Sequence, residues 1–215
     1  MPTVYGISAS PFVRKVRVFL AEKNISYDME PVIPGRASID YRKISPLGKI
    51  PAFRDGDFAI SDSSVICAYI ERTKPHPPLY PSDPKEYARA LWLEEYGDTA
   101  LGGVLTAKIF FHRVVRPMLI GESGDHQVVD QAIAEEVPHL FGYLEEQLAA
   151  REFLAGSIFS IADIGVATQF VNAAHAGFTV DGKRWPRLAA FVERIVTRSS
   201  FAACIEEERS ALPSS

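Results

Sequence analysis

The segment from Ser8 to Lys23, SASPFVRKVRVFLAEK, places a serine hydroxyl where it could stabilise an anion. Ser10 followed by Pro11 predicts a helix start, because serine caps an unpaired amide and proline at the first helical position has no amide to leave unpaired. The positive end of the helix dipole favours a negative charge at the same place. Ser10 is therefore either a simple N-cap or a cap that also donates a hydrogen bond to an anionic group.

Two further polar segments lie downstream. SPLGKIPAF contains Lys49, Ile50 and Pro51, and ISDSS contains Asp62 and Ser63 immediately before an apolar helical pattern. Most X-Pro bonds are trans, so the residues alone predict a trans bond at Pro51. Any helix that needs a cap would also select an aspartate or serine at its start. Neither segment indicates a binding site when it is taken by itself.

The elements that would position these residues form an α/β unit. A short strand precedes the Ser10 helix, and the following strand should lie parallel to it through a right-handed crossover. Apolar runs on either side of Asp55, Gly56 and Asp57 predict a β-hairpin. The expected elements are a strand at 3–7, a helix from 11, a strand at 26–33, a weakly helical stretch at 36–44, hairpin strands at 50–53 and 58–60, and a helix from about 63 to 72.

Residues 74–84 contain five prolines and are expected to link this domain, residues 1–73, to an all-helical domain, residues 85–215. The first long helix should end at Pro117, and Pro138 should kink the second near Ala134. Ser160 and Asp163 form a capping box ahead of a helix that Gly177 should stop. Further helices follow to about residue 211.

Composition excludes several classes of protein. The 215 residues are 47% apolar and 23% charged, with a formal net charge of −4, which argues against nucleic-acid binding. No run is long enough to span a membrane, and no secretory leader is present, so we expect a cytoplasmic protein. The two cysteines and five histidines show neither CxxC nor paired metal-ligand spacing. We expect no metal.

Taken together, SPFVRKVR, SPLGKIPAF and ISDSSVICAYIE resemble the cytosolic glutathione S-transferases in this order and at these spacings. The likeness is to the serine-type members, theta-, zeta- or tau-like and bacterial in style. It covers essentially the whole chain and implies a thioredoxin-like βαβ-ββα domain followed by the all-α domain. It also implies a homodimer with glutathione as co-substrate.

The resemblance assigns a role to each motif. Ser10 would stabilise the glutathione thiolate, which matters because a thiol with a pKa near 8.5 is only a few per cent ionised at neutral pH. Pro51 would follow a cis bond that turns the Ile50 main chain toward the tripeptide, with Lys49 near one of its carboxylates. Asp62 and Ser63 would hold the γ-glutamyl end, although the family usually has glutamate at the aspartate position. Ser8 and Tyr5 compete with Ser10 for the sulfur.

The acceptor site is harder to predict. Phe12, Phe110 and Phe111 could wall an apolar pocket between the domains, although aromatic residues at helical spacing are more often core. The expected reaction is addition of the thiolate to an electrophilic, partly apolar small molecule. One alternative is a glutathione-dependent isomerase similar to maleylacetoacetate isomerase, although this sequence lacks the fuller SSCS-type motif. Another is a non-catalytic module that binds glutathione or a partner.

Overall fold

A four-stranded mixed sheet organises the N-terminal domain. The computed structural model describes residues 1–35 and 38–212. Strand β1 (Thr3–Tyr5) pairs in parallel with β2 (Asp28–Glu30) and antiparallel with β3 (Ala52–Asp55), which continues into the hairpin strand β4 (Phe58–Ser61). The strand order is β2-β1-β3-β4. The predicted βαβ unit and hairpin are confirmed, although β1 and β2 are shorter than expected.

The alternation of side chains along β1 assigns the two faces of the sheet. Val4 faces helices α1 (Pro11–Glu22) and α3 (Ser63–Thr73) in the main apolar core. Tyr5 packs on the opposite face with Tyr41 of the short helix α2 (Tyr41–Ile44). Of the stretch expected to be weakly helical, only α2 is helical, and residues 36 and 37 lie outside the described residues. The two faces of the sheet are therefore covered by different helices.

The linker from Lys74 to Asp83 has no regular secondary structure, and Pro84 is the first residue of the next helix. Helix α4 (Pro84–Tyr96) continues through the π-helical segment η1 (Gly97–Val115) into α5 (Arg116–Ile120). The prediction that Pro117 ends this helix is wrong. Pro117 lies inside this continuous helix, where η1 gives way to α5, and a proline in a helix interior can kink the helix instead of ending it. The chain turns only at Gly121, with φ of 72°.

The remaining helices follow the local sequence signals more closely. Helix α6 (His126–Gln131) passes through a π-helical turn, η2 (Ala132–Glu136), into α7 (Val137–Gln147), so the deviation expected from Pro138 occurs in the turn before it. The capping box of Ser160 and Asp163 starts α8 (Ile161–His175), and Gly177 follows its end with φ of 68°. Helices α9 (Pro186–Val196) and α10 (Ser199–Ala211) complete the domain.

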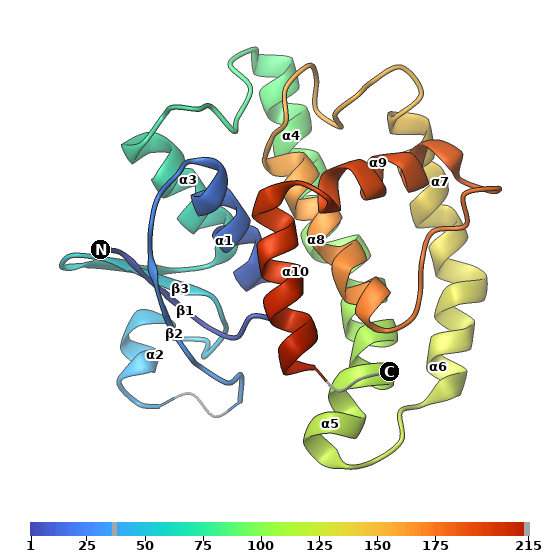
Figure 1. Ribbon diagram of the computed structural model, residues 1–215, viewed down its shortest axis with the longest axis horizontal. Helices are drawn as coiled ribbons and strands as arrows, with labels where there is room; N and C mark the ends of the chain where they lie inside the picture. Colours follow the sequence, from blue (N-terminus) through green and yellow to red (C-terminus); the bar gives the residue numbers. More distant parts are fainter. Residues whose placement is uncertain (36–37, 213–215) are drawn as a thin grey trace.

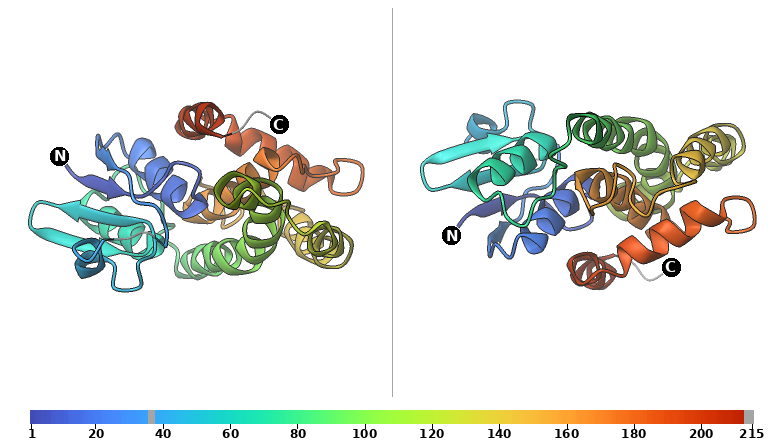
Figure 2. Two further views of the ribbon diagram at one scale, coloured as in Figure 1. Left: turned by 90° about the horizontal axis from the view of Figure 1, so that it is seen from below. Right: turned by 90° about the horizontal axis from the view of Figure 1, so that it is seen from above.

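Helix α1 forms the seam between the two domains, which lie side by side in Figure 1 and Figure 2. It packs on the sheet from one side and on α8 and α10 from the other. The sequence placed Arg14, Lys15 and Arg17 opposite the apolar stripe of α1. That side is buried as well, because the helical domain covers it. Among the described residues, no helix is long and apolar enough to cross a membrane.

Candidate functional site

A cavity of about 410 Å³ lies between the domains, at the N-terminal ends of α1 and α3. Its wall is formed by the first turn of α1, by the segment before β3, by the start of α3, and by the junction of α4 with η1. Its lining residues are Phe12, Ser45, Leu47, Lys49, Ile50, Pro51, Ser61, Asp62, Ser63, Ser64, Glu95, Asp98 and Thr99. The structure thus brings Lys49, Ile50, Pro51, Asp62 and Ser63, which the motifs predicted, to a single cavity.

The Lys49–Pro51 segment is held in place from behind. The Lys49 carbonyl accepts hydrogen bonds from the Tyr41 hydroxyl at 2.7 Å and from the Ser45 hydroxyl at 2.8 Å. The Ile50–Pro51 peptide bond is cis, as the resemblance implied. Because the carbonyl before Ile50 is fixed by two donors, the Ile50 main chain has a defined position at the cavity.

Asp62 connects the end of β4 with the start of α3. Its φ of 84° is a backbone conformation that residues other than glycine rarely adopt, and such strain is common at binding sites. Its Oδ1 accepts from the Ser64 amide at 3.0 Å and the Val65 amide at 3.2 Å, so Asp62 is the N-cap of α3. Ser63, the first helical residue, is only 4% exposed. One carboxylate oxygen is thereby committed to the helix, and the other takes no part in the cap.

Ser10 is the N-cap of α1, as predicted. Its hydroxyl oxygen accepts a long hydrogen bond of 3.4 Å from the Val13 amide, which leaves the hydroxyl proton available for donation. Ser10 does not itself line the cavity, but Phe12 in the same turn does. A Cβ atom built on Gly6 would lie 2.4 Å from Val13 and 3.4 Å from Ile50, so this glycine lets the α1 turn approach the Ile50 segment closely.

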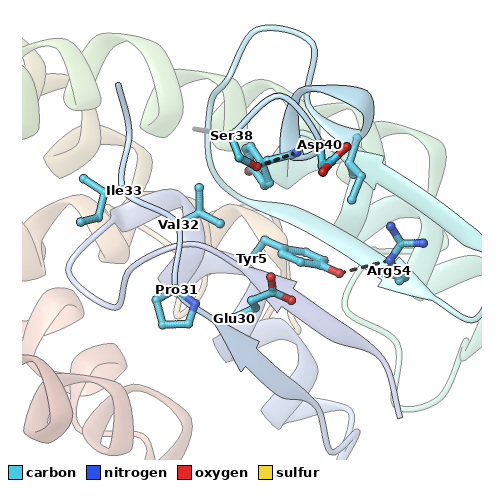
Figure 3. Close-up of a pocket in the computed structure, with 10 residues that line it drawn as sticks. Tyr5, Glu30, Pro31, Val32, Ile33, Ser38, Asp40 and Arg54 are labelled. Atoms are coloured by element: carbon cyan, nitrogen blue, oxygen red, sulfur yellow. Dashed lines mark hydrogen bonds between the residues drawn. The ribbon is translucent and has the colours of Figure 1, made fainter. Parts of the chain in front are cut away.

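The two competing residues point elsewhere. The Ser8 hydroxyl donates to Glu207 of α10. The Tyr5 hydroxyl accepts from Arg54 Nε at 3.1 Å in a different cavity, of about 480 Å³, on the α2 face of the sheet (Figure 3). Of the three candidates, Ser10 is the one in the same helical turn as a residue that lines the cavity, Phe12, which favours it over Ser8 and Tyr5.

The aromatic residues expected around an acceptor separate into two groups. Phe12 lines the cavity. The structure does not place Phe110 and Phe111 there. Phe110 is 4% exposed and belongs to the apolar core, because η1 turns it toward the neighbouring helices. Phe111 is 36% exposed and packs its ring edge against His112.

The helical domain contributes Glu95, Asp98 and Thr99 to the cavity, three residues that no motif in the sequence indicated. Lys15 connects this group to α1, since its ammonium lies 2.5 Å from Asp98 and 2.9 Å from Glu94. Burial opposes the charge of Lys15, but the Glu94 and Asp98 carboxylates outweigh it and raise the pKa of Lys15. A lysine and two acids on separate helices give no local signal that they would pair.

The described residues contain no group of three or more histidine, cysteine, aspartate or glutamate side chains placed to hold a metal ion. Cys67 and Cys204 are both buried and unbonded. Burial raises the pKa of both thiols, so neither is a reactive thiolate.

Comparison with known proteins agrees with this geometry. Residues 4–78 match the sequence model of the glutathione S-transferase N-terminal domain, and residues 126–194 match that of the C-terminal domain. The chain belongs to the glutathione S-transferase family. A glutathione S-transferase of Hyoscyamus muticus is 26% identical over 94% of this chain and 97% of its own. A probable maleylacetoacetate isomerase 1 of Drosophila melanogaster is 30% identical over 80% of this chain and 69% of its own.

The same fold is found in solved transferases. A glutathione S-transferase from Rhodospirillum rubrum F11 superimposes with a TM-score of 0.87 at 25% identity, covering 95% of this chain and 91% of its own. The agreement extends over the sheet and the helical domain together. As a glutathione S-transferase, the chain has a thioredoxin-like N-terminal domain and an all-helical C-terminal domain.

Proposed function

We propose that this transferase binds glutathione in the cavity between α1 and α3 and adds its thiolate to an electrophilic, partly apolar small molecule. The observation that carries the proposal is the convergence of three predicted motifs on one cavity of about 410 Å³. That volume lies within the range of small-molecule binding sites. The segments that line it offer groups suited to both ends of a tripeptide.

The γ-glutamyl end carries an ammonium and a carboxylate. The Asp62 oxygen that is not used in the α3 cap suits the ammonium. The carboxylate suits the hydroxyl and the amide of Ser63, at the positive end of α3. The Ile50 main chain pairs with the extended tripeptide, as in strand addition, and Lys49 is placed to meet the carboxylate at the other end.

Ser10 stabilises the sulfur as an anion in this proposal. Its hydroxyl accepts from Val13 and donates to the thiolate, while the amides of the first turn of α1 add their positive partial charge. Neither group has to remove the thiol proton permanently. Each unit by which they lower the thiol pKa corresponds to about 1.4 kcal/mol of preference for the anion.

The test is a glutathione titration, followed by thiolate absorbance as a function of pH. Ser10→Ala should still bind glutathione but should raise the pKa of the bound thiol, and Ser10→Thr, which keeps a hydroxyl, should restore it in part. Ser8→Ala is the matched control, because its hydroxyl is directed to Glu207. Absence of glutathione binding to the wild type would overturn the proposal. An unchanged thiol pKa in Ser10→Ala would reduce Ser10 to a helix cap.

A glutathione-dependent isomerase is the second candidate, and the similarity to the Drosophila melanogaster protein favours it. Transfer and isomerisation differ in the fate of glutathione, which is consumed in the first and returned unchanged in the second. A screen of electrophiles and cis–trans isomerisation substrates that measures glutathione consumption separates them. Binding of glutathione with no turnover of either kind would leave a binding module.

We also propose that the protein is a homodimer. Large apolar side chains remain exposed on β4, α3 and α4, including Phe58 at 44%, Val65 at 45% and Trp92 at 54%. Sedimentation equilibrium measures the mass directly, and a monomer at micromolar concentration would contradict this assignment.

A further inference from the structure

The turn that carries Ser10 is anchored to the helical domain by a buried arginine. Arg14 is fully buried, and its Nε and Nη2 atoms contact the two Glu208 oxygens of α10 at 2.8 and 2.5 Å. Its Nη1 donates to the carbonyl and the hydroxyl of Thr168 in α8, at 2.8 and 3.1 Å. Because the fork-shaped guanidinium holds both partners, α8 and α10 have a fixed position relative to α1.

Thr168 also forms a hydrogen bond with the start of α1. Its hydroxyl, which accepts from Arg14, donates in turn to the Pro11 carbonyl at 2.8 Å. Thr168 is fully buried, so no water competes for the bond. A hydroxyl that accepts from a cation is a stronger donor, since hydrogen bonds in a chain polarise one another.

The Pro11 carbonyl and the Phe12 amide belong to one planar peptide group. In the first turn of α1, Pro11 has no amide proton, Val13 donates to the Ser10 hydroxyl, and Arg14 donates to the Ser10 carbonyl. Phe12 therefore presents the one amide of this turn that no intrahelical acceptor satisfies. Phe12 also lines the cavity. A hydrogen bond to the Pro11 carbonyl restrains the plane of this peptide group, and it thereby fixes the direction in which the Phe12 amide points.

We propose that Thr168 is a positioning residue for the thiolate site, acting through the Pro11–Phe12 peptide group to aim the Phe12 amide and the Ser10 cap at the sulfur. This inference rests on the proposed function. Arg14 and Glu208 hold the Thr168 hydroxyl in place, and Thr168 itself does not line the cavity. The effect is electrostatic and orientational, and no bond is formed or broken by Thr168.

Two substitutions at one position separate this role from packing. Thr168→Val keeps the volume and removes the hydroxyl, whereas Thr168→Ser keeps the hydroxyl and removes a methyl group. Thr106→Val is the matched control, because the Thr106 hydroxyl also joins two helices, through Gln169 Oε1 at 2.7 Å, and within the described residues it makes no hydrogen bond to α1. The measurements are thiolate absorbance of the glutathione complex against pH, kcat, KM for glutathione, and urea unfolding.

We expect Thr168→Val to raise the pKa of the bound thiol by about one unit, which lowers the thiolate-to-thiol ratio about tenfold. At neutral pH kcat should fall, while KM for glutathione changes by less than about twofold, because the groups at the two ends of the tripeptide are untouched. Thr168→Ser and Thr106→Val should titrate as the wild type does. Should Thr168→Val not fold, Thr168→Ala removes the same hydroxyl without added bulk.

Two results have distinct meanings. If the wild type forms the bound thiolate and Thr168→Val forms it at the same pH, the inference is overturned and the proposed function stands, even where the variant is less stable. If the wild type binds no glutathione, the proposed function itself fails. Equal loss in Thr168→Val and Thr168→Ser would also overturn the inference, because the hydroxyl would not be the group responsible.

Discussion

Helix α1 borders two polar regions that differ in whether their charged side chains are paired. On the side of α8 and α10, Arg14 and Glu208 are fully buried and paired through two hydrogen bonds. On the side of the cavity, Lys49 and Asp62 are exposed, and within the described residues neither has an ion-pair partner within 4.0 Å. Buried charges that pair with one another hold the two domains in a fixed arrangement. Charges that face a cavity without a partner are available to a charged ligand.

This difference explains why buried charge does not by itself mark the active site. The Arg14–Glu208 pair is the more deeply buried of the two regions, and His175 adds a third group at 2.9 Å from Glu208. Burying two ions costs several kcal/mol, which their mutual attraction offsets only while both remain. The pair therefore makes the contact between domains specific, and the exposed groups of the cavity provide recognition.

The largest expected effect comes from breaking the buried pair. Glu208→Gln keeps the size of the side chain but leaves the Arg14 charge buried without compensation, so the free energy of unfolding should fall by about 3 to 5 kcal/mol. Urea denaturation of the wild type and the variant measures this loss in the free energy of unfolding. Glu206→Gln is the control on the same helix, because its pair with Arg209 is 79% and 69% exposed and should contribute below about 1 kcal/mol. Equal losses in both variants would remove the distinction between the two regions.

The second prediction concerns the cavity side. Asp62→Asn keeps an oxygen that can cap α3 and tolerates the positive φ, but it lacks the charge that would meet the glutathione ammonium. Hydrogen bonds to charged groups contribute about 1.5 to 3 kcal/mol, so glutathione should bind about ten- to a hundredfold more weakly. The free energy of unfolding should change by less than about 0.5 kcal/mol.

Asp83→Asn is the matched control for that variant. Asp83 caps α4 with the same hydrogen-bond pattern, accepting from the Lys85 amide at 2.9 Å and the Glu86 amide at 3.0 Å, and it does not line the cavity. Calorimetric titration with glutathione should show wild-type affinity for Asp83→Asn. Wild-type affinity for Asp62→Asn as well would make Asp62 a helix cap and nothing more.

Local signals in the sequence predicted much of the fold. The Ser10–Pro11 start, the capping box of Ser160 and Asp163, and the Gly177 stop each depend on residues within one or two turns, and the structure has all three. Pro117 misled the prediction because a proline inside a helix can kink it without ending it, and here the helix continues to Ile120.

Contacts between distant segments could not be predicted in this way. The pattern of α1 shows a basic side, but nothing in it indicates that Glu208, 194 residues later, would neutralise Arg14. The cavity shows the same limit: the motifs located Lys49 to Pro51 and Asp62 with Ser63, whereas Glu95 and Asp98 reach the cavity only through the packing of the domains. Helical spacing does not say which side of η1 meets the core, so the sequence alone does not separate Phe110, which is in the core, from a residue that lines the cavity.

The smallest expected effect tests whether the domain interface also has a pH-sensitive part. At the far end of α1, Glu22 accepts from Arg198 at 2.9 and 2.8 Å and from the Ser200 hydroxyl at 2.5 Å. Burial tends to raise the pKa of Glu22, but these donors outweigh it and the pKa is lowered from its ordinary value of 4.5.

A carboxylate whose pKa is lower in the folded state stabilises the protein above its unfolded pKa, and the benefit is lost as the pH falls through the folded value. Because Arg198 is partly exposed, the contribution of Glu22 should be about 1 kcal/mol or less. The free energies of unfolding of the wild type and Glu22→Gln, measured in urea, should therefore differ at pH 7. The difference should shrink as the pH falls below about 4.5 and vanish below the folded pKa, where the carboxylate is protonated in both states. A difference that persisted at the lower pH would mean that the amide disturbs packing at the α1–α10 contact.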